Sequence, residues 1–323
     1  MSKPNIVVLD GIAFNPGDLD WAPISDQAET FRVYPSTKPD EILDKASKAN
    51  IILTNKVQLS REVLTELKHL RAICVMSTGY NVIDVEACDE LGIALMNVPD
   101  YSSPFVAQHT FSLLLEMLNE VGKTSHKVRD GQWQEMNRWC YYESTLYELA
   151  DKTMGIVGMG NIGRRVAKIA DGFGMKVIYY SRNPKKDLLY ECLPIDDVFA
   201  QADVVSLHIQ LTEETKHLVN AQRLSIMRPN AYLLNTGRGD LIDEEALAHT
   251  LRSNKIAGAG LDVLTNEPPE NENPLIPLDN CVITPHQAWV GFEARQRLML
   301  ALQENIRLFT LGTPQNVVNT PIK

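Results

Sequence analysis

Residues 153–174 read TMGIVGMGNIGRRVAKIADGFG, a β-branched run followed by a glycine-rich loop and a helical pattern. The run Thr153–Val157 predicts a strand, and the glycines come directly after it. In such a loop Gly158 allows a tight turn, Gly160 lets the backbone approach a pyrophosphate, and Gly163 lets the helix pack closely on the strand. The alternative is a tight turn without a ligand. The residues expected to contact a dinucleotide here are Gly158, Gly160, Asn161, Ile162 and Gly163.

The alternation of strand and helix continues through the second half of the chain. Six strands are predicted there: Thr153–Val157, Lys176–Tyr180, Asp203–Leu207, Ala231–Asn235, Ala257–Asp262 and Cys281–Thr284. Six strands with crossover helices fit a doubly wound, Rossmann-type dinucleotide-binding domain. We expect this domain to span residues 101–289.

The first half repeats the pattern on a smaller scale. Its predicted strands are Asn5–Leu9, Thr30–Tyr34, Asn50–Thr54, Arg71–Met76 and Gly92–Met96. A long apolar-striped helix is predicted from Pro104 to Val121, and a last helical pattern covers residues 292–311. The fold class is therefore α/β with two doubly wound parallel-sheet domains. We expect residues 1–100 plus 290–323 to form a flavodoxin-like substrate domain.

Composition excludes several classes of protein. Lys+Arg is 31 and Asp+Glu is 41, a net charge of −10, which argues against nucleic acid or an anionic membrane surface as a partner. The five cysteines show no C-x-x-C spacing, so neither a disulfide framework nor a metal site is predicted. No apolar run approaches the length of a membrane span, and no signal peptide is evident. We expect a cytoplasmic protein.

The end of the second strand of the cofactor domain bears on the choice of dinucleotide. An NAD-specific site usually has an acid there for the ribose hydroxyls, but the chain has Ser181 followed by Arg182. An arginine can pair with a 2′-phosphate that a carboxylate would repel. The sequence therefore favours NADP(H), with NAD(H) possible. The alternative is that Arg182, Lys185 and Lys186 form a solvated charge run.

Three charged residues follow later strands of the same domain. Arg238 lies in NTGRGD, Glu267 in GLDVLTNEPP and His286 in TPHQAW. Each alone has an ordinary explanation, such as a turn cation, a surface acid or a buried histidine. Beside a nicotinamide they would supply what 2-hydroxyacid chemistry requires: a cation for the carboxylate, a proton donor for the carbonyl oxygen, and an acid that orients the donor.

These motifs make the chain similar to the D-isomer-specific 2-hydroxyacid dehydrogenase family over essentially its whole length. The matching segments are MSTGYNVID (76–84), VAQHTFSLLL (106–115), GIVGMGNIG (155–163), LLNTGRGDLIDEEAL (233–247), AGAGLDVLTNEPP (257–269) and TPHQAW (284–289). Within the family, the chain most resembles glycerate dehydrogenases and hydroxypyruvate or glyoxylate reductases.

The resemblance implies a role for individual residues. Arg238 would bind the substrate carboxylate, His286 would be the acid/base, and Glu267 would be its partner. Backbone amides at Thr78 and Gly79 would also hold the carboxylate. At the cofactor, the implied contacts are Thr236 and Asp262, the latter near the nicotinamide amide.

The expected reaction is reduction of hydroxypyruvate or glyoxylate to D-glycerate or glycolate. One alternative is a reductase of a longer sugar-derived ketoacid such as 2-ketogluconate, and another is a dinucleotide-sensing binding protein of the co-repressor type. The long helix and the aromatic-rich segment after it offer apolar surface for a homodimer, as the resemblance also implies.

Overall fold

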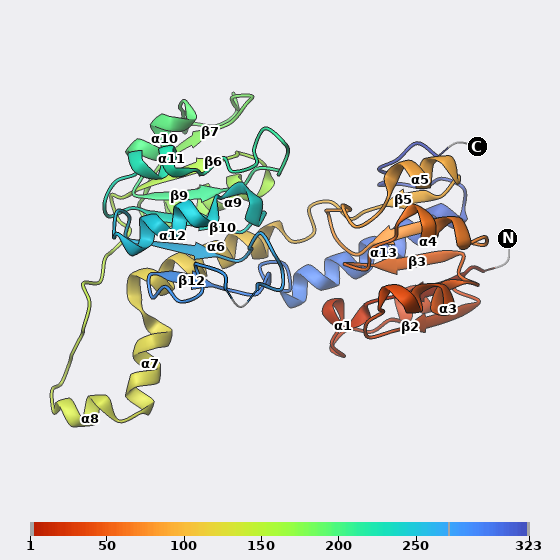
Figure 1. The fold of residues 1–323 in the computed structure, drawn as a ribbon, viewed down its shortest axis with the longest axis horizontal. Coiled ribbons are helices and arrows are strands. Elements are labelled where there is room, and N and C mark those ends of the chain that lie inside the picture. Colours follow the sequence, from red (N-terminus) through yellow and green to blue (C-terminus); the bar gives the residue numbers. More distant parts are fainter. Residues whose placement is uncertain (1–2, 271, 322–323) are drawn as a thin grey trace. The chain divides into compact units, whose positions relative to one another are not determined.

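The computed structural model describes residues 3–270 and 272–321. The chain folds into two compact units, one of Met1–Ser102 with Val290–Lys323 and the other of Ser103–Trp289. Each unit is built around its own parallel sheet (Figure 1). In the part of the chain that the structure describes, no helix is long and apolar enough to cross a membrane.

The first unit contains a five-stranded parallel sheet of order β2-β1-β3-β4-β5. This order is that of flavodoxin-like folds. Its strands are β1 (Asn5–Val8), β2 (Thr30–Val33), β3 (Ile51–Thr54), β4 (Ala72–Val75) and β5 (Ala94–Met96). Its helices are α1 (Gly11–Phe14), α2 (Ala22–Ser25), η1 (Pro39–Glu41), α3 (Ile42–Ala46), α4 (Arg61–Glu66), α5 (Val85–Glu90) and α13 (Phe292–Thr310).

The second unit contains a seven-stranded parallel sheet of order β12-β11-β10-β9-β6-β7-β8. The chain starts in the middle at β6 and winds first to one edge and then to the other, as in a Rossmann fold. Its strands are β6 (Thr153–Val157), β7 (Lys176–Tyr180), β8 (Glu191–Cys192), β9 (Val204–Leu207), β10 (Tyr232–Asn235), β11 (Gly258–Leu261) and β12 (Cys281–Ile283).

Eight helices belong to the same unit among the residues described. They are α6 (Ser103–Asn119), α7 (Val121–Arg129), α8 (Gln132–Met136), α9 (Asn161–Gly172), α10 (Ile195–Gln201), α11 (Ala221–Ile226), η2 (Gly239–Leu241) and α12 (Glu244–Arg252). In Figure 1, α7 and α8 form an arm that extends away from the sheet of this unit.

Most predicted strands are longer by one or two residues than the observed ones, and two larger differences concern a strand and a helix. The sheet has a seventh strand, β8, which the pattern misses because it is only two residues long. The helix predicted to run to Val121 ends at Asn119, because Glu120 takes a left-handed φ of 47° and interrupts the helical path. A second helix, α7, then begins at Val121.

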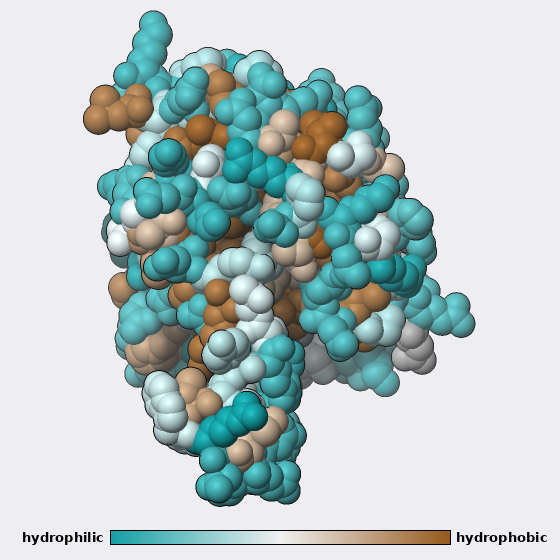
Figure 2. Space-filling model, turned by 90° about the vertical axis from the view of Figure 1, so that its left-hand side faces the viewer, coloured by the Kyte–Doolittle hydropathy of each residue, from teal (hydrophilic) through white to brown (hydrophobic). Residues whose placement is uncertain are grey.

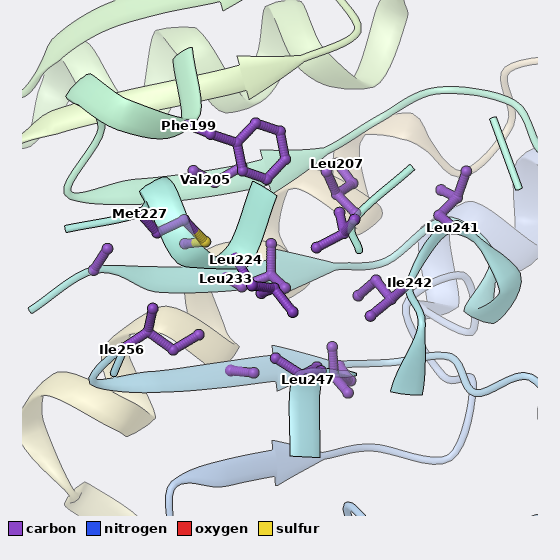
Figure 3. Packing of buried hydrophobic residues seen from close by; sticks show 14 of the residues in the cluster. Phe199, Val205, Leu207, Leu224, Met227, Leu233, Leu241, Ile242, Leu247 and Ile256 are labelled. Carbon is purple, nitrogen blue, oxygen red and sulfur yellow. The ribbon is translucent and has the colours of Figure 1, made fainter. Parts of the chain in front are cut away.

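Apolar side chains on one face of the second sheet form its largest core cluster. Figure 3 shows side chains from α10, α11 and α12, among them Phe199, Leu224 and Leu247, gathered over strands β9 and β10. Each such side chain, fully removed from water, contributes about 1.5–3 kcal/mol to folding. Because the strands of this sheet are parallel, their carboxyl ends lie at one edge of it. The outer face of the unit is mostly hydrophilic where Figure 2 shows it.

Candidate active site

The glycine loop joins β6 to α9. Gly158 has a φ of 102°, a conformation that favours glycine, and a Cβ on it would lie 2.3 Å from the carbonyl oxygen of His208. A Cβ on Gly163 would lie 2.1 Å from the carbonyl oxygen of Gly158, so the helix packs directly on the loop. Gly160 is the N-cap residue of α9, so no side chain caps this end of the helix, and the space beside Gly160 is open. The N–H groups at Asn161 and Ile162 thus begin an uncapped helix, which fits a pyrophosphate.

His208 follows β9 and lies beside this loop. The ring nitrogen Nε2 is 2.8 Å from Oγ of Ser206, which is fully buried. His208 itself is partly exposed, yet desolvation of its imidazole lowers its pKa to about 3. The folded protein therefore keeps this ring neutral at pH values where an ordinary histidine takes up a proton.

Acid is therefore expected to destabilise the fold through His208. Between about pH 6.5 and 3 the unfolded chain binds the proton and the folded chain does not, so the free energy of unfolding falls as pH falls. The slope from this group is at most about 1.4 kcal/mol per pH unit. Urea titrations from pH 7 to 4.5 measure it, and the His208→Gln variant should show a flatter dependence. An unchanged slope in the variant would contradict this assignment.

The loop after β7 carries the basic residues Arg182, Lys185 and Lys186, where we expect the adenosine ribose of the dinucleotide to bind. Three contacts hold it: Ser181 Oγ donates to the carbonyl of Asn183 at 3.0 Å, the N–H of Lys185 donates to Tyr179 Oη at 2.9 Å, and Arg164 pairs with Asp187 at 2.6 and 3.1 Å.

Arg182 itself extends from this loop. Its side chain is 71% exposed, and its nearest acid is Glu214, with Nη1 and Oε2 3.8 Å apart. Because Glu214 is also highly exposed, this ion pair is weak and leaves the guanidinium available to another anion.

Arg238 lies in a loop after β10 that is fixed by a buried asparagine. Oδ1 of Asn235 accepts from the N–H of Gly237 at 3.0 Å, and its Nδ2 donates to the carbonyl of Arg238 at 2.8 Å. A Cβ on Gly239 would lie 2.0 Å from the backbone of Leu264, so this loop packs against the segment that leads to Glu267. Arg238 is exposed, and its Nη1 donates to the carbonyl of Gly237 at 2.7 Å.

His286 and Glu267, 19 residues apart in sequence, are in direct contact. Nδ1 of His286 lies 2.5 Å from Oε2 of Glu267, whose Oε1 accepts from the N–H of Leu264 at 3.1 Å. With Nδ1–H donating to the carboxylate, Nε2 is the nitrogen left for a ligand. Nε2 has no hydrogen-bond partner among the residues that the structure describes. Both side chains line a cavity of about 620 Å³ whose walls include Leu264, Ile276 and Ile283.

Asp262 is 1% exposed, and both of its carboxylate oxygens accept hydrogen bonds. Oδ1 accepts from Thr284 and from the N–H of Gln287, and Oδ2 accepts from the N–H of Ala288. Burial acts to raise the pKa of Asp262, but hydrogen bonds from His109, Thr284 and the two amides outweigh it, so the pKa is lowered. The carboxylate is therefore ionised and engaged with the protein; its contact with a nicotinamide amide stays a prediction.

The remaining predicted residues lie in two places. Thr236 follows β10, with its Oγ1 3.2 Å from Oγ1 of Thr110 on α6. Thr78 and Gly79 follow β4 in the first unit, where Thr78 Oγ1 donates to the carbonyl of Val98 at 2.9 Å. Their roles in substrate binding stay predictions. Within residues 3–270 and 272–321, no group of three His, Cys, Asp or Glu side chains could hold a metal ion.

Comparison with known proteins gives relatives over the full chain. The model of the D-isomer specific 2-hydroxyacid dehydrogenase NAD-binding domain matches residues 111–288. A hydroxypyruvate reductase of Blautia hydrogenotrophica is 40% identical over 97% of this chain and 99% of its own. A glycerate dehydrogenase of Methylorubrum extorquens is 36% identical over 89% of this chain and 91% of its own.

Solved structures agree with these sequence relatives. An acyclic imino acid reductase in complex with NADPH and D-arginine is 33% identical, with a TM-score of 0.85 over 97% of this chain and 99% of its own. A D-lactate dehydrogenase of Aquifex aeolicus, complexed with NAD and lactic acid, is 28% identical, with a TM-score of 0.82 over 96% of each chain. The chain is an oxidoreductase with a Rossmann domain and belongs to the D-isomer-specific 2-hydroxyacid dehydrogenase family.

Proposed function

We propose that the protein reduces small 2-ketoacids, hydroxypyruvate and glyoxylate foremost, to D-2-hydroxyacids with NADPH. The observation that carries this proposal is the His286–Glu267 pair, which leaves one imidazole nitrogen for a substrate. The names of the sequence relatives support the choice of ketoacids.

Each member of the site has one task in this reaction. When bound at the glycine loop, a reduced nicotinamide dinucleotide supplies the hydride. His286 acts in its imidazolium form, in which both ring nitrogens carry a proton. Its Nδ1–H donates to Glu267, which fixes the ring, and its Nε2–H passes to the oxygen that develops negative charge. Arg238 binds the carboxylate of the ketoacid.

Absorbance of the reduced nicotinamide tests the proposal directly. Purified protein is mixed with hydroxypyruvate, glyoxylate or 2-ketogluconate, with NADPH and NADH in parallel. Fast oxidation of NADPH with the two small ketoacids supports the proposal, and preference for 2-ketogluconate would favour the longer-substrate alternative. If no ketoacid is turned over although the dinucleotide binds, the proposed reaction is wrong.

The preference for NADPH rests on the exposed Arg182 and on the absence of an acid at Ser181. Arg182→Ala is expected to raise KM for NADPH by about tenfold or more and KM for NADH by less than about twofold, because only NADPH carries the 2′-phosphate. Arg165, an exposed cation on α9, gives a matched control variant, Arg165→Ala. Equal changes in both KM values would remove Arg182 from cofactor selection.

We also propose a homodimer in the cytoplasm. The arm formed by α7, α8 and the following segment exposes aromatic side chains, including Trp139 at 91% and Tyr142 at 77%. Apolar surface of this kind is typical of an interface. Light scattering at micromolar concentration distinguishes a dimer from a monomer.

A further inference from the structure

A chain of hydrogen bonds connects helix α6 to the loop that carries His286. Nε2 of His109, on α6, lies 2.9 Å from Oγ1 of Thr284, and Thr284 donates to Oδ1 of Asp262 at 2.6 Å. The hydroxyl of Thr284 has a single proton and gives it to the carboxylate, so it accepts from His109. His109 must therefore carry a proton on Nε2, which also lies 3.4 Å from Oδ1 of Asp262.

Asp262 in turn binds three successive amides of that loop. Its main-chain oxygen accepts from the N–H of His286 at 2.8 Å, and its carboxylate accepts from the N–H groups of Gln287 and Ala288 at 2.9 and 2.8 Å. His286 has a φ of 50°, a left-handed conformation that is uncommon for a residue with a side chain. Such a backbone persists only where its surroundings hold it.

We propose that His109, Thr284 and Asp262 form a clamp that fixes the backbone at His286 and so orients its imidazole for proton transfer. This inference rests on the proposed role of His286 as the acid. Glu267 restrains the ring only through Nδ1, whereas the clamp restrains the backbone from which the ring extends. His109 and Thr284 are thus positioning residues, which reach the substrate only through His286.

Burial makes the clamp hard to replace by water. His109 is 9% exposed and Asp262 is 1% exposed, so a lost donor would leave the carboxylate with fewer partners in a desolvated place. The ring of Phe105 stacks on that of His109, with centroids 6.2 Å apart, which keeps the histidine facing Thr284. A small displacement of an acid from its substrate can cost one to two orders of magnitude in rate, roughly, so the clamp affects turnover more than binding.

The test compares Thr284→Val, which removes the hydroxyl at nearly constant volume, with Thr284→Ser, which keeps it. Thr284→Val is expected to lower kcat by about tenfold or more, with KM for the ketoacid and Kd for NADPH within about twofold. Thr284→Ser should recover most of the loss. Stopped-flow single turnovers at saturating substrate should show that NADPH oxidation itself slows. His109→Phe should act like Thr284→Val, and His109→Gln, which retains an N–H donor, should be milder.

Thr250 provides the matched control for stability. It is 5% exposed on α12, and its hydroxyl donates within its own helix to the carbonyl of Ala246. Thr250→Val should therefore leave kcat unchanged whatever it does to Tm. A Thr284→Val variant with the single-turnover rate of Thr250→Val overturns the clamp, and so does a Thr284→Ser variant as slow as Thr284→Val. The two proposals fail separately. If the wild-type protein is inactive with all ketoacids, the proposed function is wrong. If the wild type is active and Thr284→Val is as fast, only the clamp is wrong.

Discussion

His286→Ala is expected to lower kcat for ketoacid reduction by about 10²–10⁴-fold. Without the imidazole, the developing alkoxide must take its proton from water, which is a poorer and less well-placed donor. The Nε2 proton is the one at stake, because Nδ1 is committed to Glu267 at 2.5 Å. Steady-state kcat at saturating ketoacid measures the loss, and fluorescence titration with NADPH checks that the cofactor site is intact.

Two further variants separate this role from a structural one. His249→Ala removes an exposed histidine on α12 and should retain wild-type kcat. Glu267→Gln should be impaired less than His286→Ala, and the double variant should be no slower than His286→Ala alone, because Glu267 acts through the imidazole. Near-wild-type turnover in His286→Ala would refute the assignment, and an additive loss in the double variant would give Glu267 a separate role.

The parallel strands could be predicted because each is a short β-branched run between helical patterns. Thr153–Val157 and Lys176–Tyr180 begin and end at the predicted residues. The sequence pattern did not predict strand β8, because Glu191–Cys192 is too short to show alternation and pairs only at the sheet edge. The break in the helix at Glu120 was not predicted either, because its cause is a backbone conformation that the apolar stripe of the helix does not reveal.

The contact between His286 and Glu267 was within reach of sequence reasoning. Both residues follow strands of one parallel sheet, whose carboxyl ends share an edge. The clamp could not be predicted from the sequence, because His109 and Thr284 are 175 residues apart and neither residue stands out in its own segment. His109 lies in an apolar helix stripe, and Thr284 is only the first residue of TPHQAW. The role of the buried Asn235 was missed for a different reason: its partners, Gly237 and Arg238, lie only two and three residues away, but the sequence does not show that its side-chain amide turns back onto this loop.

Arg238→Ala is expected to lower kcat/KM for hydroxypyruvate by at least about tenfold, because a charge-assisted hydrogen bond to a carboxylate contributes about 1.5–3 kcal/mol. Asn235 and Gly239 hold the backbone of this loop independently of the guanidinium, so the truncation should leave the loop in place. Arg238→Lys should recover only part of the loss, since an ammonium lacks the planar pair of donors. Steady-state kinetics of the three proteins measure these differences.

Two additions to that assay show whether the guanidinium acts on the carboxylate. Guanidinium ion in the buffer should partly restore the Arg238→Ala variant, because the truncated side chain leaves room for it beside an exposed loop. Glycolaldehyde, which is hydroxypyruvate without its carboxylate, should be reduced about equally slowly by wild type and variant. If Arg238→Ala slows the reduction of glycolaldehyde as much as that of hydroxypyruvate, Arg238 has a structural role in the site. A residue that acts only by binding the carboxylate should not affect a substrate that has no carboxylate.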